Sequence, residues 1–441
     1  MARISLADWP TTEPFLKLPH PYLTPYLVFQ SSKSHPEIPE AKLFQLRVGQ
    51  QDASRTTPPQ PLHNEKLYFT EPQDLKSSDR PADSNNTAWA RARRSPSVTI
   101  LWDDATPSLG QVWLLSYILF TVRADEEFIR LRLVGEGKDI IATQLKTVML
   151  AVNHPLGDSH TGLPDELILI RSTFWQGAGS PFGSRPIWLP EDNAAGLSSL
   201  PPAPLDYIMT NNPQTALCWH PRRAAKPRPG SVIYSRYIPH LKETFSMIAL
   251  DYENPEHLAL FHQWQNDPRV SQGWNETGTL EQHREYLRKI HDDPHQFTVL
   301  AAFDDTLFAY FEIYWGKEDR LGAYYPANDF DRGRHSLVGD IRYRGQHRVG
   351  AWWSSQMHYL FLDDPRTMYI VGEPKFTNSI VLTYDLMHGF SIDKFVDLPH
   401  KRSGLMKCSK ERFFQICPLG EDSGGKVKVV GGTGIGLVPK L

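Results

Sequence analysis

Cysteine is scarce in this sequence: Cys218, Cys408 and Cys417 are the three present among 441 residues. An odd number at these spacings matches neither a disulfide framework nor a set of zinc ligands. We therefore expect free thiols, a reducing compartment and no metal site.

Long apolar runs and an excess of one charge are also missing. No run approaches the ~20 apolar residues that a membrane-spanning helix needs. The start, "MARISLADWPTTEPF", lacks the continuous apolar core of a signal peptide. The formal net charge is −3, so we expect no general attraction to nucleic acid or to an anionic membrane. Any anion site must be local.

The length of 441 residues exceeds the ~100 to 200 residues usual for one domain, and we expect two domains. Residues 50–98 are polar and proline-rich, which indicates a surface insertion in an N-terminal domain at 1–219. "HPRRAAKPRPGS", residues 220–231, has basic residues, prolines and a glycine without periodicity, which favours a linker over a nucleic-acid patch. A second domain at 232–417 and a flexible, glycine-rich tail at 418–441 follow.

Hydrophobic periodicity predicts the elements of both halves. In the N-terminal half, strands are expected at "SVTILW", "EEFIRLRLV" and "ELILIRSTFW", with a helix from Pro107 to about Thr121. In the C-terminal half, strands are expected at "TFSMIALD", "FTVLAAF", "LFAYFEIYW", "HSLVGDIR", "TMYIVGE", "SIDKFVDLP" and "KRSGLMKCS", and helices from Pro255, Leu280, Val349 and Asn378. The order of this half is β-α-α-β-β-β-α-β-α-β-β, and the predicted fold class is α/β (α+β).

A basic loop that contains glycine precedes one of these helices. Arg342, Arg344 and Arg348 surround Gly345, and Gly350 stands at the expected helix start. Unpaired backbone N–H groups and the positive end of the helix dipole suit a pyrophosphate. We predict that these residues bind the phosphates of a cofactor; the alternative is a basic turn between core elements.

Together with the order of elements, "DIRYRGQHRVGAWW" resembles the GCN5-related N-acetyltransferase (GNAT) superfamily. The resemblance implies a mixed central sheet flanked by helices and acyl-CoA as co-substrate. It also implies a gap between the strand before the loop and the strand that carries "GEP", in which the pantetheine arm lies. We interpret the N-terminal half as a similar but degenerate GNAT-like domain in tandem, without the basic loop. It would shape the acceptor pocket or a homodimer interface.

A narrower resemblance covers residues 243 to 415, through "NDPRVSQGW", "YFEIYWGKED", "DFDRGRHSLVGDIRYRG", "YLFLDDPRT", "VGEPKFTN", "MHGFS" and "DLPHKRSGLM". These motifs look like the siderophore-biosynthesis branch of the superfamily, with the fungal hydroxyornithine transacylases that use anhydromevalonyl-CoA. The implied function is acyl transfer to N5-hydroxyornithine, giving a hydroxamate for fusarinine-type siderophores. The alternatives are an acetyl-CoA-dependent hydroxyornithine or hydroxylysine acetyltransferase and a non-catalytic acyl-CoA-binding scaffold.

The resemblance also implies the catalytic residues. His335 lies where related bacterial enzymes place their catalytic histidine, and the ordinary pKa of histidine suits a base. Glu373, in "GEP", is the predicted acidic partner. Many members have a tyrosine as the acid for the departing thiolate; that place falls on Asp385 here, and Tyr384 precedes it. A structural histidine and a core tyrosine are the alternatives.

The acceptor amino acid carries an amine and a carboxylate, so polar groups should surround it. Residues at strand ends or connections are the predicted substrate contacts, with an exposed turn as the alternative: Trp274, Glu312, Trp315, Lys317, Glu318 and Asn378.

The chain ends in Pro439-Lys440-Leu441, a variant of the S-K-L peroxisomal address. The glycine-rich stretch before it could leave this terminus free for the import receptor. We expect a peroxisomal protein; the alternative is a tail without meaning on a cytoplasmic protein.

Overall fold

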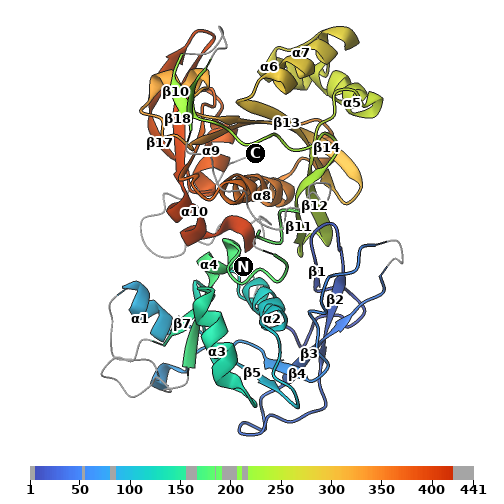
Figure 1. The fold of residues 1–441 in the computed structure, drawn as a ribbon, viewed down its shortest axis with the longest axis vertical. Coiled ribbons are helices and arrows are strands. Elements are labelled where there is room, and N and C mark those ends of the chain that lie inside the picture. The colour runs from blue at the N-terminus through green and yellow to red at the C-terminus, as the bar shows by residue number, and fades with distance from the viewer. Residues whose placement is uncertain are drawn as a thin grey trace. The chain divides into compact units, whose positions relative to one another are not determined.

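The computed structural model describes residues 5–51, 55–79, 86–154, 166–183, 185–190, 206–210 and 217–420. The chain divides into two compact units, Met1–Ile187 and Trp188–Leu441 (Figure 1). This division comes earlier than the linker predicted at 220–231. The predicted linker lies within the second unit, where it begins in a strand and is held by an ion pair between Arg223 and Glu318. Most of the predicted tail, from residue 421 onward, lies outside the described residues.

The first unit is built on an eight-stranded sheet in the order β1-β2-β3-β4-β5-β6-β8-β7. Its strands are β1 (Leu16–Lys17), β2 (Pro25–Gln30), β3 (Leu43–Val48), β4 (Leu67–Thr70), β5 (Ser97–Trp102), β6 (Phe128–Val134), β7 (Ala151–Asn153) and β8 (Glu166–Ile170). Its helices are η1 (Ser77–Asp79), α1 (Ala88–Arg93), α2 (Leu109–Val122), α3 (Lys138–Thr147) and α4 (Arg171–Trp175).

Buried side chains correct two of the predicted elements of this unit, the insertion at 50–98 and the strand at "ELILIRSTFW". The polar region 50–98 contains β4, whose four residues are all buried between β3 and β5, so it is not only a surface insertion. The predicted strand "ELILIRSTFW" turns into helix α4 after Ile170, because Phe174 and Trp175 pack on the aromatic rings of α2.

The second unit contains an eight-stranded sheet in the order β11-β12-β13-β14-β15-β16-β18-β17, and a small sheet of β9 and β10. Its strands are β9 (Tyr207–Met209), β10 (Trp219–Pro221), β11 (Val232–Ile238), β12 (Glu243–Ala249), β13 (Gln296–Phe303), β14 (Thr306–Trp315), β15 (Arg332–Val338), β16 (Tyr369–Gly372), β17 (Ser391–Leu398) and β18 (Lys401–Ser409). Its helices are α5 (Pro255–Gln265), α6 (Pro268–Trp274), α7 (Leu280–Asp292), η3 (Arg320–Tyr324), η4 (Ile341–Tyr343), α8 (Gln346–Asp363), α9 (Ser379–Met387), α10 (Lys410–Ile416) and η5 (Pro418–Gly420).

The predicted order of elements is present in the second unit, with additions. Strand β11 and helices α6 and α10 were missed by sequence reasoning. Strand β15 begins at Arg332, earlier than predicted, because its arginines are buried against carboxylates: Arg332 pairs with Asp363 and Arg334 with Asp385. A charged strand of this kind does not show the apolar alternation that marks a strand in sequence.

The two large sheets share one strand order, which confirms the tandem fold. In each, five antiparallel strands are followed by a parallel neighbour and then by an antiparallel pair whose order is reversed. The parallel strands are joined through α2 in the first unit and through α8 in the second. A parallel pair needs a crossover connection of this kind, usually a helix.

The parallel pair differs between the units. β5 and β6 are paired at five successive positions, from Ser97 with Arg130 to Leu101 with Val134. β15 and β16 are paired only at Arg332 with Ile370 and Gly333 with Val371. The sheet of the second unit therefore splays open beyond Gly333, as the resemblance implied, while the corresponding strands of the first unit stay paired.

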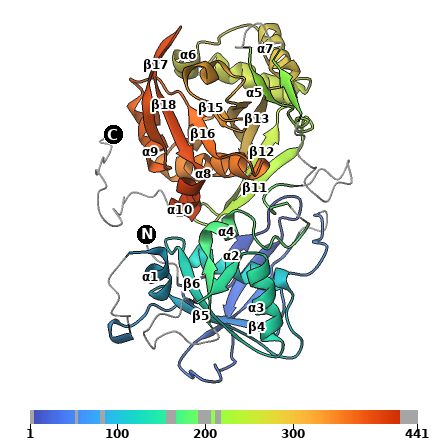
Figure 2. The same cartoon turned by 60° about the vertical axis from the view of Figure 1, so that its left-hand side comes forward.

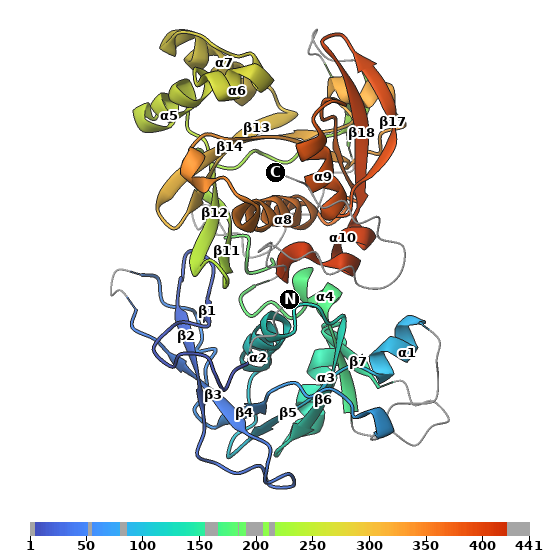
Figure 3. The ribbon, with the colours of Figure 1, turned by 180° about the vertical axis from the view of Figure 1, so that it is seen from behind.

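Helices cover both faces of the second sheet. Helices α5, α6 and α7 lie on one side of β13 and β14, and α8 lies on the other (Figures 1 and 3). In the view of Figure 2, β15 and β16 lie above α8. Leu258, Phe261 and Trp264 of α5 belong to one buried apolar cluster with residues of β13 and β14, as their spacing predicted. In the part of the chain that the structure describes, no helix combines the length and apolarity needed to cross a bilayer.

Candidate active site

His335 lies between two carboxylates, at the level where the sheet opens. Its Nδ1 is 2.9 Å from Oε2 of Glu312, and its Nε2 is 2.6 Å from Oε1 of Glu373. Glu312 is the cross-strand neighbour of His335 on β14, and Glu373 directly follows β16. The three side chains therefore come from β14, from β15 and from the residue after β16, and the last paired residue of β15, Gly333, lies two residues before the histidine.

Glu312 is fully engaged in holding this histidine. Its other oxygen accepts hydrogen bonds from the hydroxyls of Tyr286, at 2.6 Å, and Tyr310, at 3.0 Å. Burial opposes ionisation of Glu312, but the bonds from His335 and the two tyrosines outweigh burial and lower its pKa. Glu312 was predicted as a substrate contact; in the structure it lines the cavity, and its carboxylate is bonded to His335 and the two tyrosines.

Glu373 is the second carboxylate on His335, as the sequence predicted. It also accepts a hydrogen bond from Tyr314, at 2.9 Å, and lies 3.6 Å from Nζ of Lys401. Burial opposes its ionisation, but the charge and hydrogen bond of His335 lower its pKa to about 2. A carboxylate with these partners stays ionised at every physiological pH.

The same contacts keep the imidazole protonated. Burial favours the neutral ring, but Glu373 and Glu312 raise the pKa of His335 to about 10. The ring is 37% exposed, so it reaches the solvent of a cavity. At neutral pH His335 is thus an imidazolium with a carboxylate on each nitrogen, rather than the neutral base that its ordinary pKa suggested.

The cavity has a volume of about 2070 Å³ and joins several predicted residues. His335, Glu373, Trp274 and Asn378 are among its walls. Trp274 presents its ring at 83° to the imidazole, with 6.3 Å between ring centres. Asn378 caps α9 through a bond from the Val381 N–H. The volume exceeds the ~300 to 1,000 Å³ of a typical small-ligand pocket, so there is room for two substrates.

Asp385 lines the cavity from α9 but is committed to an arginine. Its Oδ1 accepts a hydrogen bond of 2.7 Å from Arg334, whose guanidinium lies 4.3 Å from the ring centre of Trp353. Burial raises the pKa of Asp385 to about 6 in spite of this pairing. Tyr384, the alternative acid, is half-buried with its ring 5.7 Å from that of Trp353.

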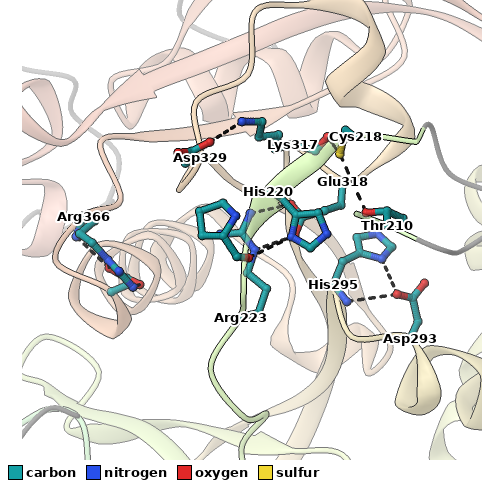
Figure 4. A network of polar contacts seen from close by, with 12 residues as sticks. Thr210, Cys218, His220, Arg223, Asp293, His295, Lys317, Glu318, Asp329 and Arg366 are labelled. Carbon is teal, nitrogen blue, oxygen red and sulfur yellow. Dashed lines mark hydrogen bonds and ion pairs between the residues drawn. The ribbon is translucent and has the colours of Figure 1, made fainter. Parts of the chain in front are cut away.

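Glu318 and its neighbours anchor a strap, by which we mean residues 206–210 and 217–226, which contain β9 and β10. Glu318 accepts two hydrogen bonds of 2.6 Å from Arg223, and its Oε1 is 2.9 Å from Nδ1 of His220 (Figure 4). Lys317 is paired with Asp329. These carboxylate and ammonium groups were predicted to contact the substrate; in the structure both are paired with protein partners, and Glu318 also lines the cavity.

Trp315 has the same anchoring role. Its ring lies between two guanidinium groups, 4.2 Å from that of Arg223 and 4.1 Å from that of Arg332. Trp315 is absent from the residues that line the cavity, whereas Glu318 contributes to its wall. Sequence reasoning could not find these partners, because Arg223 lies about 90 residues away in the stretch taken for a linker.

The basic loop is only partly available for phosphates. Arg342 pairs with Asp340, and Arg348 pairs with Glu243. Arg344 is exposed, and its side chain makes no hydrogen bond or ion pair within the described residues. Of the predicted arginines, Arg344 is thus the one whose charge is free for a ligand.

The start of α8 is open to an anion. Gly345 is its N-cap, with φ of +129°, and no side chain caps the helix there. A Cβ at this position would come within 2.9 Å of the His347 ring, and its φ is one that other residues rarely adopt, so the N-cap position requires glycine. Gly350 was expected at the helix start but lies one turn further in, because α8 begins at Gln346. The open helix end and Arg344 fit the phosphates of an acyl-CoA.

The first unit lacks these features at the corresponding place. The loop after β5 carries Asp103 and Asp104, and Ser108 caps α2 in a capping box with Gln111. The helix end is thus closed by its own side chains, and the acidic loop would repel a phosphate. Among the described residues of either unit, no group of His, Cys, Asp or Glu side chains could hold a metal ion.

Sequence reasoning missed the three tyrosines and Lys401 around the histidine. Tyr310, Glu312 and Tyr314 alternate on β14, which was a usable signal, since residues two apart share one face of a strand.

Known proteins match both the site and the whole chain. Residues 253–398 match the family model described as "Acetyltransferase (GNAT) domain". The chain is 56% identical to the N(5)-hydroxyornithine:cis-anhydromevalonyl coenzyme A-N(5)-transacylase of Beauveria bassiana, over 99% of each protein. It is 52% identical to a putative O-acetyltransferase of Stachybotrys chartarum, over 99% of each. It is 50% identical to a hydroxyornithine transacylase of Ajellomyces capsulatus, over 92% of this chain and 94% of the relative.

Proposed function

The chain belongs to the GNAT acyltransferases of siderophore biosynthesis, and on this premise we propose that it transfers an acyl group from CoA to N5-hydroxyornithine. The products are a hydroxamate and free CoA. The observation that carries the proposal is His335, held between Glu312 and Glu373 where β15 and β16 part. The name of the Beauveria relative supports cis-anhydromevalonyl-CoA as the donor.

The chemistry requires a neutral nitrogen, a proton acceptor and a proton donor. The hydroxylamine nitrogen attacks the thioester carbonyl, a C–N bond forms, the C–S bond breaks, and the nitrogen loses a proton. The proton passes to the Glu373–His335 pair, in which Glu373 is the ionised carboxylate on Nε2 and Glu312 fixes the ring through Nδ1. The pKa of His335 is about 10 and that of Glu373 about 2, because each charge stabilises the other. The two groups therefore exchange protons as one coupled unit.

The departing thiolate needs a proton from the α9 side of the cavity. Asp385 lines the cavity there, and burial raises its pKa to about 6, closer to neutrality than an ordinary aspartate. Tyr384 is the competing donor, one residue earlier on the same helix. The acyl-CoA phosphates bind at the start of α8 beside Arg344, and the pantetheine arm lies along the strand edges exposed by the splay.

The proposal is tested by turnover of the purified protein with N5-hydroxyornithine and a series of acyl-CoAs. Ferric ion gives a coloured complex with a hydroxamate but not with an O-acyl ester, so the assay also separates N-transfer from the O-transfer named for the Stachybotrys relative. We expect hydroxamate and free thiol in equal amounts, faster with a branched C6 enoyl-CoA than with acetyl-CoA. His335→Ala should lower kcat by about 100-fold or more, because it removes one half of the Glu373–His335 pair to which the proton passes.

Two outcomes would contradict it. Binding of CoA without any turnover would support the scaffold alternative. Turnover that His335→Ala leaves intact would move the chemistry to other residues.

We also propose import into peroxisomes and a place in fusarinine-type siderophore assembly and iron homeostasis. The support for import is Pro439-Lys440-Leu441, which lies outside the described residues, and the cytoplasm is the alternative. A fluorescent protein fused before the full chain should co-localise with a peroxisomal marker and become diffuse when these three residues are deleted. Diffuse fluorescence with the tripeptide intact would exclude receptor-dependent import.

A further inference from the structure

Basic side chains gather on the side of the cavity next to Glu373. Lys401 begins β18, His400 precedes it in the turn after β17, and Arg320 begins η3. All of them line the cavity that contains His335. Arg320 and His400 are exposed, and neither makes a hydrogen bond or an ion pair within the described part of the chain. Their polar groups therefore remain available to a ligand.

Contacts place this group beside the reacting side chains. Nζ of Lys401 is 3.6 Å from Oε1 of Glu373, the same oxygen that lies 2.6 Å from Nε2 of His335. Burial lowers the pKa of His400, and the positive charges of Lys401, Arg320 and His335 lower it further, against the opposing effect of Glu373. His400 is therefore neutral at pH 7, while Lys401 and Arg320 supply positive charge.

A guanidinium and an ammonium that face a common cavity are suited to a carboxylate. The planar fork of arginine matches two carboxylate oxygens, and lysine adds a point charge. The proposed acceptor has one carboxylate, at the end of the molecule opposite to its hydroxylated nitrogen. The hydroxylamine nitrogen lies at His335 and Glu373, where it gives up its proton. The carboxylate end therefore needs a cationic partner further along the cavity wall.

We infer that Arg320, with His400 beside it, binds the α-carboxylate of the acceptor amino acid, and that the positive charge of Lys401, which is paired with Glu373, adds to the attraction. The inference rests on the proposed function and adds the group that fixes the far end of the substrate. Because one end is held by Arg320 and the other must reach His335, the spacing between them selects side-chain length. Hydroxylysine, longer by one methylene, should be the poorer acceptor, by about tenfold or more.

The experiment pairs a protein change with a matching change in substrate. Native protein and Arg320→Gln are assayed with N5-hydroxyornithine and with N-hydroxy-1,4-diaminobutane, which keeps the chain and the hydroxylamine but lacks the carboxylate. Native protein should prefer hydroxyornithine, mainly through KM. Arg320→Gln should lower kcat/KM for hydroxyornithine by about tenfold, the usual worth of one charge-assisted bond, and the preference between the two acceptors should collapse.

Controls separate binding from folding. Arg402→Gln removes an arginine next to Lys401 that is 64% exposed, pairs with Asp397 and does not line the cavity, so it should leave both acceptors unaffected. Arg320→Lys should restore part of the preference for hydroxyornithine. An equal loss with both acceptors in Arg320→Gln, or no loss with hydroxyornithine, would overturn the inference.

Calorimetry of hydroxyornithine binding gives a readout that does not need turnover. The Kd should rise about tenfold in Arg320→Gln. If native protein binds hydroxyornithine in this arginine-dependent way but forms no hydroxamate, the carboxylate site stands and the proposed function fails. If native protein makes hydroxamate and Arg320→Gln binds hydroxyornithine as tightly, the function stands and the carboxylate site fails.

Discussion

Removing the Glu373 carboxylate should return His335 toward the behaviour of an ordinary histidine. In the native site the imidazole is 2.6 Å from Glu373 and 2.9 Å from Glu312. These carboxylates raise the pKa of His335 from 6.5 to about 10, against burial, and the charge of Glu373 is the larger of their contributions. Glu373→Gln keeps the size of the side chain and removes that charge.

The magnitude follows from the distance between the two side chains. An opposite charge this close shifts a pKa by about 1 to 3 units, so removing the charge of Glu373 should lower the pKa of His335 from about 10 to between about 7 and 9. The native pair also contributes to stability, with opposite signs of pH dependence. The raised pKa of His335 stabilises the fold fully below pH 6.5, and this is lost as pH rises through about 10. The lowered pKa of Glu373 stabilises it above pH 4.5, and this is lost as pH falls through about 2.

The assay is an NMR titration of the His335 ring, with the signal assigned by its loss in His335→Gln. The native signal should not move between about pH 6 and 8, and the Glu373→Gln signal should titrate near the upper end of this range or within it. The pH profile of kcat/KM should gain an inflection at the same pH in the variant. Glu285→Gln is the matched control, because Glu285 is an exposed carboxylate of α7 outside the cavity, paired with Arg288.

One result would refute this reasoning: a native His335 that titrates near pH 6.5. It would mean that the two carboxylates do not hold the imidazolium, and His335 would then be the simple neutral base expected from sequence.

Two further predictions concern the strap and the donor site. Arg223→Gln should destabilise the second unit by about 3 to 5 kcal/mol, because it leaves Glu318 buried without its main partner; urea unfolding measures this, and the neighbouring Arg222→Gln, whose pair with Asp206 is exposed, should cost at most about 1 kcal/mol. Equal effects of the two changes would show that the strap is not anchored through Glu318. Arg344→Gln should raise the KM for acyl-CoA by about tenfold with little change in kcat, and an effect on kcat alone would place this arginine outside the phosphate site.

Sequence patterns predicted most of the second unit because its strands and helices are local and regular. The capped start of α5, the hairpin of β13 and β14 and the order of elements all follow from spacings within about 20 residues. His335 and Glu373 were predicted from motifs that the family resemblance made meaningful, and the structure brings them into contact.

The missed features depend on contacts between distant parts of the chain. Glu312 and His335 become neighbours only through the register of β14 and β15, which a single sequence does not specify. In the sequence, Trp315 and Glu318 stand at the end of a strand with no evident partner. In the structure, the guanidinium of Arg223 contacts both of them. The strand β4 was hidden because four buried residues within a long polar stretch give too short a signal.

The central claim is that this site makes a hydroxamate from an acyl-CoA and hydroxyornithine. The most direct test is a single turnover of purified protein with branched C6 enoyl-CoA and N5-hydroxyornithine, in which the product is identified by mass and by its ferric complex. We predict one hydroxamate for each CoA released, with both formed by His335→Ala at a rate lower by about 100-fold or more. Release of CoA without hydroxamate, or an O-acyl product, would contradict the account.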